Sequence, residues 1–297
     1  MKSNYEKGLF ILLVVFLLLG SEVWYSYWRI DKANKAKIAL EENYLMQNKR
    51  ALSQLEIDAK SFAIYDFTLD RELYSHNADM VLPLASLTKV ISIPLAVKHN
   101  SYDVIITPES IRFPGDDTLL VGDIWMSREL AKFALVLSSN DATEALTMRI
   151  PDLILEMNQQ VKRFGAQHTT FLNTTGLDID GVPSGLGTAR DMNILTRAAL
   201  LNDPDLFEAT IHQSLHTNSR TTPYVVQNTN VFIDTLGTVL FSKTGYTVLA
   251  GGNLSVIVRH KNGHDIGITV LGSGYETRFT DMAKIVAALY DIQYENN

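Results

Sequence analysis

Strand-like segments stand at both ends of the region 59–297, and the pattern between them is mainly helical. Residues 61–75 hold two short aromatic and β-branched runs joined by a turn, which predicts a hairpin. Residues 253–271 hold two longer runs on either side of Asn262-Gly263, a dipeptide favoured in tight hairpin turns. This arrangement predicts an α+β domain. Its antiparallel sheet is built from both chain ends and flanked by helices, and a mainly helical subdomain is inserted between them.

The middle of the chain is divided by short polar breaks. A capping sequence, Thr188-Ala189-Arg190-Asp191, precedes one of the apolar runs. Apolar spacing predicts helices over 127–137, 141–150, 151–164, 192–201 and about 277–294.

An uncharged run, GLFILLVVFLLLG at 8–20, stands near the N-terminus and is extended by aromatic residues up to Trp28. With that aromatic end the run reaches membrane-spanning length, and no pair of small residues marks a cleavage site after it. We expect residues 1–28 to be an uncleaved N-terminal transmembrane helix; a cleaved signal peptide is the alternative. The basic residues after the run outnumber those before it, which by itself predicts the opposite orientation, with the remaining chain inside the cell.

Residues 29–58 are rich in Ala, Lys, Glu, Asn and Gln, and Ile38, Leu45 and Leu52 repeat every seven residues. The other seam position is poorly filled, so we expect a helical stalk rather than a coiled coil, followed by one domain at 59–297. The net charge of -7 argues against a nucleic-acid binder, and the absence of cysteine excludes disulfides and thiolate metal sites.

Ser86-Leu87-Thr88-Lys89 begins an apolar run with helical spacing, directly after a loop that holds Pro83. Serine and lysine three residues apart share a helix face. A serine hydroxyl becomes a nucleophile when a neighbouring base takes its proton, and a lysine can be that base where burial and nearby positive charge keep it neutral. A helix cap followed by a solvated lysine is the alternative, because S-x-x-K alone occurs about once by chance in a chain of this length.

Two further motifs follow in order. Ser138-Ser139-Asn140 separates two predicted helices, and Lys243-Thr244-Gly245 precedes the second hairpin. Lys-Thr-Gly is expected by chance in fewer than about one chain in ten of this size. The three motifs together, each in a suitable context, indicate one active site.

From about residue 61 to the last helix, the sequence resembles the serine D-alanyl-D-alanine carboxypeptidases, the low-molecular-weight penicillin-binding proteins. The likeness extends beyond the three motifs to YDFTLDRELYSHNADMVLPLASLTK, LSSNDATEAL, TTGLDIDGVPSGLGTARDM and SKTGYTVLAGGNL. It implies the β-lactamase/transpeptidase-like fold. Two features depart from the family pattern: Pro94 lies in the helix after the nucleophile, and DTLGTVLFS replaces the usual lead-in to Lys243.

The resemblance implies which residues are catalytic. Ser86 Oγ would attack the carbonyl of the terminal D-Ala-D-Ala bond while Lys89 accepts its proton. Ser138 would pass a proton to the leaving amine, and Asn140 would hold the lysine and the substrate amide.

The resemblance also implies the substrate-binding residues. Lys243 and Thr244 would bind the free carboxylate of the substrate by charge-assisted hydrogen bonds. Gly245 would let the strand approach the substrate, which could add alongside it as an extra strand. The backbone N–H of Tyr246 would complete an oxyanion hole with that of the nucleophile. The charge of Lys243 would also help to keep the catalytic lysine neutral.

We therefore expect a serine-type D-Ala-D-Ala carboxypeptidase that trims peptidoglycan stem peptides, is acylated by β-lactams and uses no cofactor. We expect it on the bacterial cell membrane, single-pass, with its catalytic domain outside. The enzyme alternatives are a D,D-endopeptidase and a class A β-lactamase. The β-lactamase needs a glutamate that activates water, and Glu156, the one glutamate between 151 and 187, does not match that family's E-x-x-L-N. A membrane-tethered β-lactam sensor or scaffold without turnover is the alternative from another class.

Two other pairs of polar residues have simpler interpretations. His212 and His216 stand four residues apart but have no third ligand nearby, so we expect no metal site. Asp178 and Asp180 are interpreted as surface-loop carboxylates.

Overall fold

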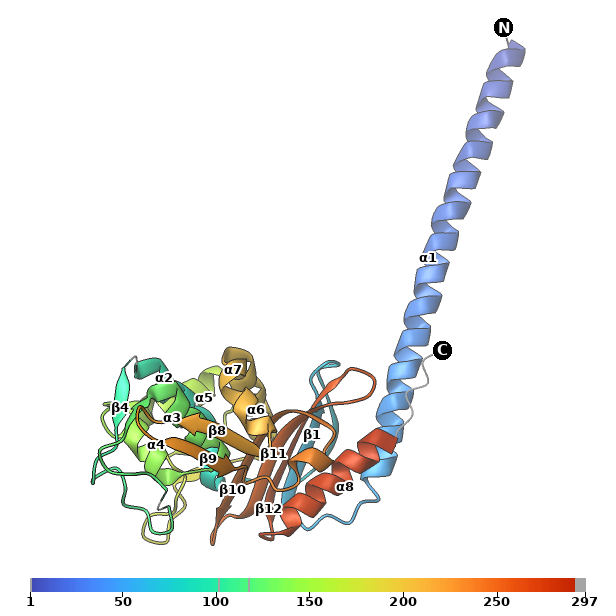
Figure 1. Ribbon diagram of the computed structural model, residues 1–297. Helices are drawn as coiled ribbons and strands as arrows, with labels where there is room; N and C mark the ends of the chain where they lie inside the picture. The colour runs from blue at the N-terminus through green and yellow to red at the C-terminus, as the bar shows by residue number, and fades with distance from the viewer. Residues whose placement is uncertain (1, 101, 117, 292–297) are drawn as a thin grey trace. The chain divides into compact units, whose positions relative to one another are not determined.

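The computed structural model describes residues 2–100, 102–116 and 118–291, without the side chains of 2–4, 6, 7, 11–15 and 17. It divides into two units, 1–48 and 49–297. The first unit belongs to helix α1 (Lys2–Leu52), which continues without a break from the predicted anchor into the predicted stalk (Figure 1). Among the described residues, none of the helices has the length and apolar character needed to cross a membrane. The side chains of 11–15 and 17, which belong to the predicted anchor, lie outside the described residues.

A five-stranded antiparallel sheet forms the centre of the second unit (Figure 1). Its strand order is β10-β11-β12-β1-β2. Because β1 pairs with β12, strands from the two ends of the domain are neighbours, and the predicted α+β arrangement is confirmed. The five strands are β1 (Ser61–Asp66), β2 (Arg71–His76), β10 (Thr238–Thr247), β11 (Gly251–Arg259) and β12 (Asp265–Ser273).

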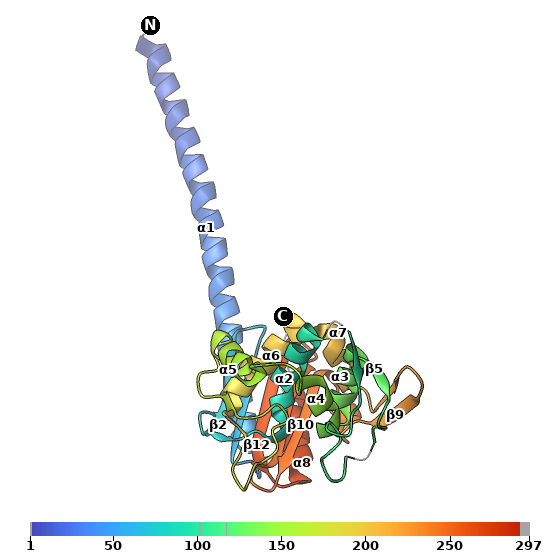
Figure 2. The ribbon, with the colours of Figure 1, turned by 90° about the vertical axis from the view of Figure 1, so that its left-hand side faces the viewer.

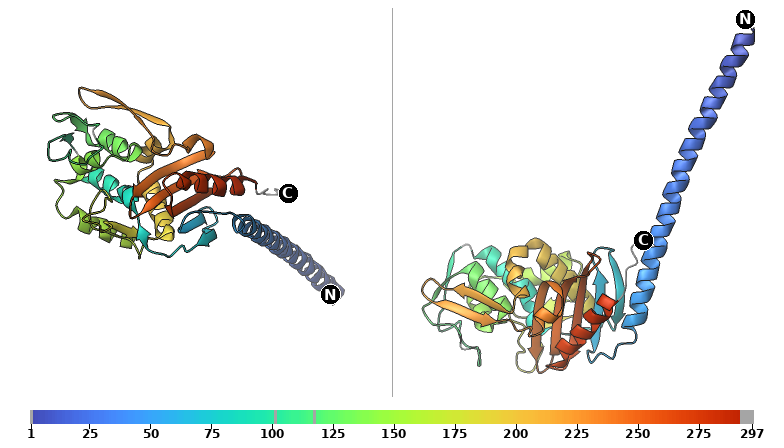
Figure 3. Two further views of the ribbon diagram at one scale, coloured as in Figure 1. Left: turned by 90° about the horizontal axis from the view of Figure 1, so that it is seen from below. Right: turned by 45° about the vertical axis from the view of Figure 1, so that its right-hand side comes forward.

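Helices cover both faces of this sheet. β11 and β12 are buried along almost their whole length, which requires cover on each side. Helix α8 (Thr277–Asp291) packs on one face and α6 (Ala189–Asn202) on the other (Figures 1 and 3). Asn193 joins α6 to the sheet, because its amide donates to Ala63 O (3.0 Å) and accepts from Thr269 Oγ1 (2.8 Å).

The middle of the chain forms the predicted helical subdomain beside the sheet. Its central element is α2 (Lys89–His99), which continues through Pro94 and packs against α3, α4, α5 and α6 (Figure 2). Val90, Ile93 and Ala96 on α2 are fully buried. The other elements of this part are β3 (Leu82–Pro83), β4 (Asp103–Ile105), β5 (Ile124–Met126), α3 (Ser127–Val136), α4 (Asn140–Thr147), α5 (Leu153–Arg163), β6 (Thr170–Phe171), β7 (Gly185–Gly187), α7 (Pro204–Phe207), β8 (Ser214–Asn218) and β9 (Pro223–Gln227).

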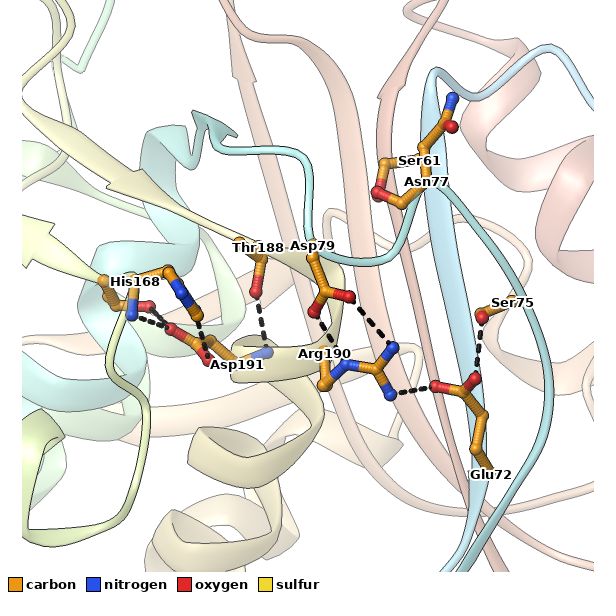
Figure 4. A network of polar contacts seen from close by, with 10 residues as sticks. Ser61, Glu72, Ser75, Asn77, Asp79, His168, Thr188, Arg190 and Asp191 are labelled. Carbon is orange, nitrogen blue, oxygen red and sulfur yellow. Dashed lines mark hydrogen bonds and ion pairs between the residues drawn. The ribbon is translucent and has the colours of Figure 1, made fainter.

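Arg190 fastens the segment before β3 to the start of α6 (Figure 4). Its guanidinium donates to Asp79 Oδ1 (2.7 Å) and to the carboxylate of Glu72 on β2. At the same helix end, the predicted cap is present, since Thr188 Oγ1 accepts from the N–H of Asp191 (3.0 Å). The chain that leads to the Ser86 motif is therefore held against both the sheet and α6.

Candidate active site

Ser86 lies in a short 3-10 turn, Ala85–Thr88, that runs directly into α2. Ala85, just before it, has a φ of +49°, a left-handed conformation that is uncommon for a residue with a Cβ atom. Such outliers persist where the surrounding structure holds them in place, often beside functional groups. The turn places Ser86 Oγ 2.9 Å from Lys89 Nζ, so the two residues share one face as the sequence predicted.

Lys89 is completely buried and held by three oxygens. Its Nζ lies within hydrogen-bond distance of Ser86 Oγ, donates to Asn140 Oδ1 (2.7 Å) and donates to the backbone oxygen of Thr175 (3.0 Å). Burial lowers the pKa of Lys89 to about 7, while the carboxylate of Asp116 acts in the opposite direction. A large share of this lysine is therefore neutral near pH 7 and able to accept a proton. Burial is the main cause of this low pKa; the repulsion between Lys89 and Lys243, which the sequence suggested as a contribution, acts in the same direction.

The second motif stands at the start of α4 and divides its three residues between two tasks. Ser139 caps the helix, because its Oγ accepts from the N–H of Ala142 (3.0 Å). Ser138, with a φ of +61°, and Asn140 contact the two motif lysines instead. Ser138 Oγ accepts a hydrogen bond from Lys243 (2.8 Å), and Asn140 holds Lys89.

Lys243 on β10 is a second buried amine in the same site. Besides Ser138, its Nζ donates to the backbone oxygen of Thr244 (3.0 Å). Burial, and after it the positive charges of Lys89 and Arg278, hold the pKa of Lys243 well below its usual range. The side chain of Thr244 is within 2.6 Å of Thr229 Oγ1, a partner that the sequence did not predict. The site thus contains two buried amines, that of Lys89 beside Ser86 and that of Lys243 beside Ser138.

Two glycines allow the backbone to close around the Ser86 turn. A Cβ atom at Gly245 would lie 2.8 Å from the carbonyl oxygen of Leu84, so the glycine lets β10 pack against this turn. From the sequence we expected Gly245 to allow a close approach to the substrate; in the structure its close neighbour is the protein's own backbone at Leu84. On the other side, Gly176 has a φ of +81°, and a Cβ there would lie 1.9 Å from Ala85 O. The lack of a Cβ therefore lets Gly176 lie against Ala85, and the backbone oxygen of its neighbour Thr175 holds Lys89.

Arg278, in the first turn of α8, is the cation of the site that sequence reasoning missed. It is 4% exposed, and its Nε and Nη1 have no hydrogen-bond partner in the part of the chain that the structure describes. Its guanidinium carbon lies 4.5 Å from the ring centroid of Tyr275, and Tyr275 packs edge-on against Tyr246 at 4.7 Å. In the sequence, a single arginine in an amphipathic helix looks like a surface residue, so its position did not indicate that it belongs to the site. Its buried charge suits an anionic substrate group.

The two histidines considered as a metal pair do not lie on one helix. His216 is on β8, and His212 follows a 3-10 turn that ends at Ile211. Within the described ranges, no group of three or more His, Asp or Glu side chains is arranged to hold a metal ion.

The sequence pattern of the family described as D-alanyl-D-alanine carboxypeptidase matches residues 48–274. The chain belongs to this family. Its members are serine peptidases, and the matched residues include all three motifs around Ser86, Ser138 and Lys243.

Individual relatives agree with this assignment. The D-alanyl-D-alanine endopeptidase of Haemophilus influenzae is 30% identical over 75% of this chain and 79% of its own length. The carboxypeptidase DacF of Bacillus subtilis is 27% identical over 86% of this chain and 67% of its own. Among solved structures, penicillin-binding protein D2 of Listeria monocytogenes in its ampicillin-bound form has a TM-score of 0.71 and 28% identity, covering 80% of this chain and all of that one. The fold is thus that of the penicillin-binding D-Ala-D-Ala peptidases.

Proposed function

We propose that this protein is a serine D-Ala-D-Ala carboxypeptidase that removes the terminal D-alanine from peptidoglycan stem peptides. The buried Lys89 amine, 2.9 Å from Ser86 Oγ and fixed by Asn140 and Thr175, carries this proposal. A neutral lysine in this place takes the hydroxyl proton as Ser86 Oγ attacks the carbonyl of the scissile bond. The bond to the leaving amine then breaks, the proton that Lys89 had accepted passes to the amine by way of Ser138, and an ester remains on Ser86. Water later hydrolyses that ester.

The substrate's terminal carboxylate would be bound by the cationic side of the site. Lys243 and Arg278 are both buried basic side chains, and Thr244 adds a hydroxyl next to Lys243; a bound carboxylate would favour the charged form of the lysine. Charged hydrogen bonds of this kind are shorter and stronger than neutral ones. We further propose that the backbone N–H groups of Ser86 and Tyr246 stabilise the oxyanion and that the peptide lies along β10 at Gly245, as the family resemblance implies.

β-lactams would acylate the same serine. The ampicillin-bound form of the similar Listeria protein supports this extension. In a β-lactam the leaving group stays attached after ring opening, whereas D-alanine departs and leaves room for water. The penicillin ester should therefore persist for minutes or longer, while peptide is turned over.

Two measurements on the purified chain test this function together. Fluorescent penicillin should label the protein on Ser86, and a diacetylated Lys-D-Ala-D-Ala tripeptide should release D-alanine. Rapid hydrolysis of penicillin without D-alanine release would assign the chain to the β-lactamases instead. A stable label without any turnover of peptide would support the sensor or scaffold alternative.

Endopeptidase activity is a second candidate, favoured by the 30% identity to the Haemophilus endopeptidase. A D-Ala crosslink places a second peptide on the leaving-group side, and the same Ser86 chemistry would cut it. Comparing kcat/KM on a crosslinked peptide dimer and on the linear tripeptide separates the two activities, since a pure carboxypeptidase should leave the dimer intact.

We also propose that residues 1–28 anchor the protein in the bacterial cell membrane by a single pass, with residues 59–297 outside. The uncharged run at 8–20 and the location of the peptidoglycan substrate support this arrangement. Protease added to intact spheroplasts should digest the domain. Complete protection of the domain would reverse the orientation, and recovery of a chain that starts after residue 20 would instead show a cleaved signal peptide.

A further inference from the structure

Two carboxylates fasten the segment from Arg112 to Asp116 to the start of α4. Asp116 Oδ2 accepts from the backbone N–H of Asn140 and from that of Asp141, the latter at 3.1 Å. In return, Asp141 Oδ1 accepts from the backbone N–H of Arg112 (2.9 Å) and of Phe113 (3.1 Å). The contacts are reciprocal: each carboxylate takes two N–H groups from the other segment.

These reciprocal hydrogen bonds of Asp116 and Asp141, here called the clasp, provide acceptors for backbone N–H groups at the start of α4. The first N–H groups of a helix have no partner within it. Here Asp116 takes the first two of α4, and Ser139 takes the third, that of Ala142. Asn140 is consequently fixed from both sides, by Asp116 at its backbone and by the Lys89 amine at its side chain.

We propose that Asp116 is a positioning residue of this active site: its carboxylate holds the Asn140 backbone so that the Asn140 amide oxygen fixes Lys89 opposite Ser86. The inference rests on the proposed function, because it assigns Asp116 to the acylation of Ser86. None of the three motifs includes Asp116, and it reaches the site through the fold.

The negative charge of Asp116 acts on Lys89, the same residue that its hydrogen bonds help to position through Asn140. It opposes the effect of burial on Lys89 and raises the pKa of that amine. The facing basic groups are Lys243 on β10 and, beyond it, Arg278 on α8. Asp141 is engaged by the N–H groups of the clasp. Other charged groups on α4 and on the helices around α2 pair elsewhere: Glu144 with Arg112, Arg128 with Asp203, Lys132 with Glu129, Glu156 with His99 and Arg190 with Asp79.

The test is the pH dependence of acylation in the full chain carrying Asp116→Asn. Asparagine keeps an acceptor oxygen but has no charge, so the pKa of Lys89 should fall and the rising limb of the acylation rate should move to lower pH. Asp116→Ala removes charge and acceptor together. It should show the same limb shift and lower the plateau rate by up to about a hundredfold, since misplacing a catalytic group by about 1 Å can have an effect of that size.

Asp141→Asn is the matched control. It weakens the other half of the clasp and should lower the melting temperature, but it should leave the limb where it is in the unaltered chain. An undiminished plateau rate in Asp116→Ala, or an equal limb shift in Asp141→Asn, would overturn the proposal. If Asp116→Asn does not fold, Asp116→Ser, which also has an uncharged acceptor, should show the same shift of the rising limb to lower pH. Acylation of the unaltered chain is measured first; its absence would refute the proposed function itself and the role of Asp116 with it.

Discussion

Lys243 on β10 donates a 2.8 Å hydrogen bond to Ser138, which precedes α4. This contact joins the sheet to the helical subdomain across the site. On the other side, Lys89 joins Ser86 to Asn140. Two buried amines thus connect the three motifs, and each can be altered separately.

Acylation by penicillin should rise as the pH increases through about 7. The active form of Lys89 is the neutral one, and burial lowers its pKa from 10.5 to about 7. Above that pH the amine is free to accept the Ser86 proton; below it, protonation blocks the step. Stopped-flow measurement of the second-order acylation rate across this range gives the midpoint. A midpoint near 10 would show that burial does not lower the pKa of Lys89 as described.

Ser86→Ala and Lys89→Ala should each abolish the penicillin adduct, as should Lys89→Arg, because a guanidinium stays protonated and cannot act as a base. Intact-mass and peptide-mapping spectra detect the adduct. Ser139→Ala is the control, since Ser139 caps α4. It should weaken stability by about 1 kcal/mol but keep the adduct on the Ser86 peptide. An adduct on Ser138 or Ser139 in any variant would contradict the assignment of the nucleophile.

Lys243→Ala and Arg278→Gln should each reduce kcat/KM for the tripeptide by roughly ten- to hundredfold. That range corresponds to loss of one charged hydrogen bond, about 1.5 to 3 kcal/mol. The reason is electrostatic, so a tripeptide whose C-terminal carboxylate is amidated should be a poor substrate for the unaltered chain and should lose little more in either variant. Equal losses on both substrates would assign these residues to the structure of the site rather than to recognition of the carboxylate.

Gly176→Ala should abolish acylation or folding. Its Cβ would meet the carbonyl oxygen of Ala85 at 1.9 Å, so the Ser86 turn has to move. Gly181 offers a matched control: its φ of +76° is similarly left-handed, but a Cβ there meets nothing within 4 Å. Gly181→Ala should therefore show only the backbone strain, about 1 kcal/mol in thermal unfolding, and retain acylation. Similar losses of acylation and stability in both variants would show that the backbone strain at positive φ, and not the clash with Ala85, causes the effect.

The sequence predicted those parts of the site that local spacing determines. Ser86 and Lys89 meet because three residues on a helical turn bring side chains together, and Thr188 caps α6 because the capping pattern is local. The α+β class followed from strand patterns at the two chain ends, and the β1–β12 pairing confirmed it.

The sequence did not predict the residues that reach the site from distant segments. Arg278 arrives on α8, and Thr175 offers a backbone oxygen, which has no side-chain signature. Asp116 lies in an irregular segment outside the three motifs, where spacing gives no sign of its partners. For Gly245, the residue was predicted but its neighbour was not, because only the fold shows that Leu84 lies behind it. The membrane anchor stays a prediction.

The two buried lysines also couple the folding of this domain to protons in solution. In the unfolded chain Lys89 has its ordinary pKa of 10.5 and is charged at about pH 8, whereas in the folded domain its pKa of about 7 leaves it mostly neutral. Lys243 acts in the same direction. Folding at that pH must therefore release protons, and the free energy of unfolding contributed by these amines must increase as the pH rises from about 7 towards 10.5. The enthalpy of unfolding measured near pH 8 should consequently depend on the ionisation enthalpy of the buffer.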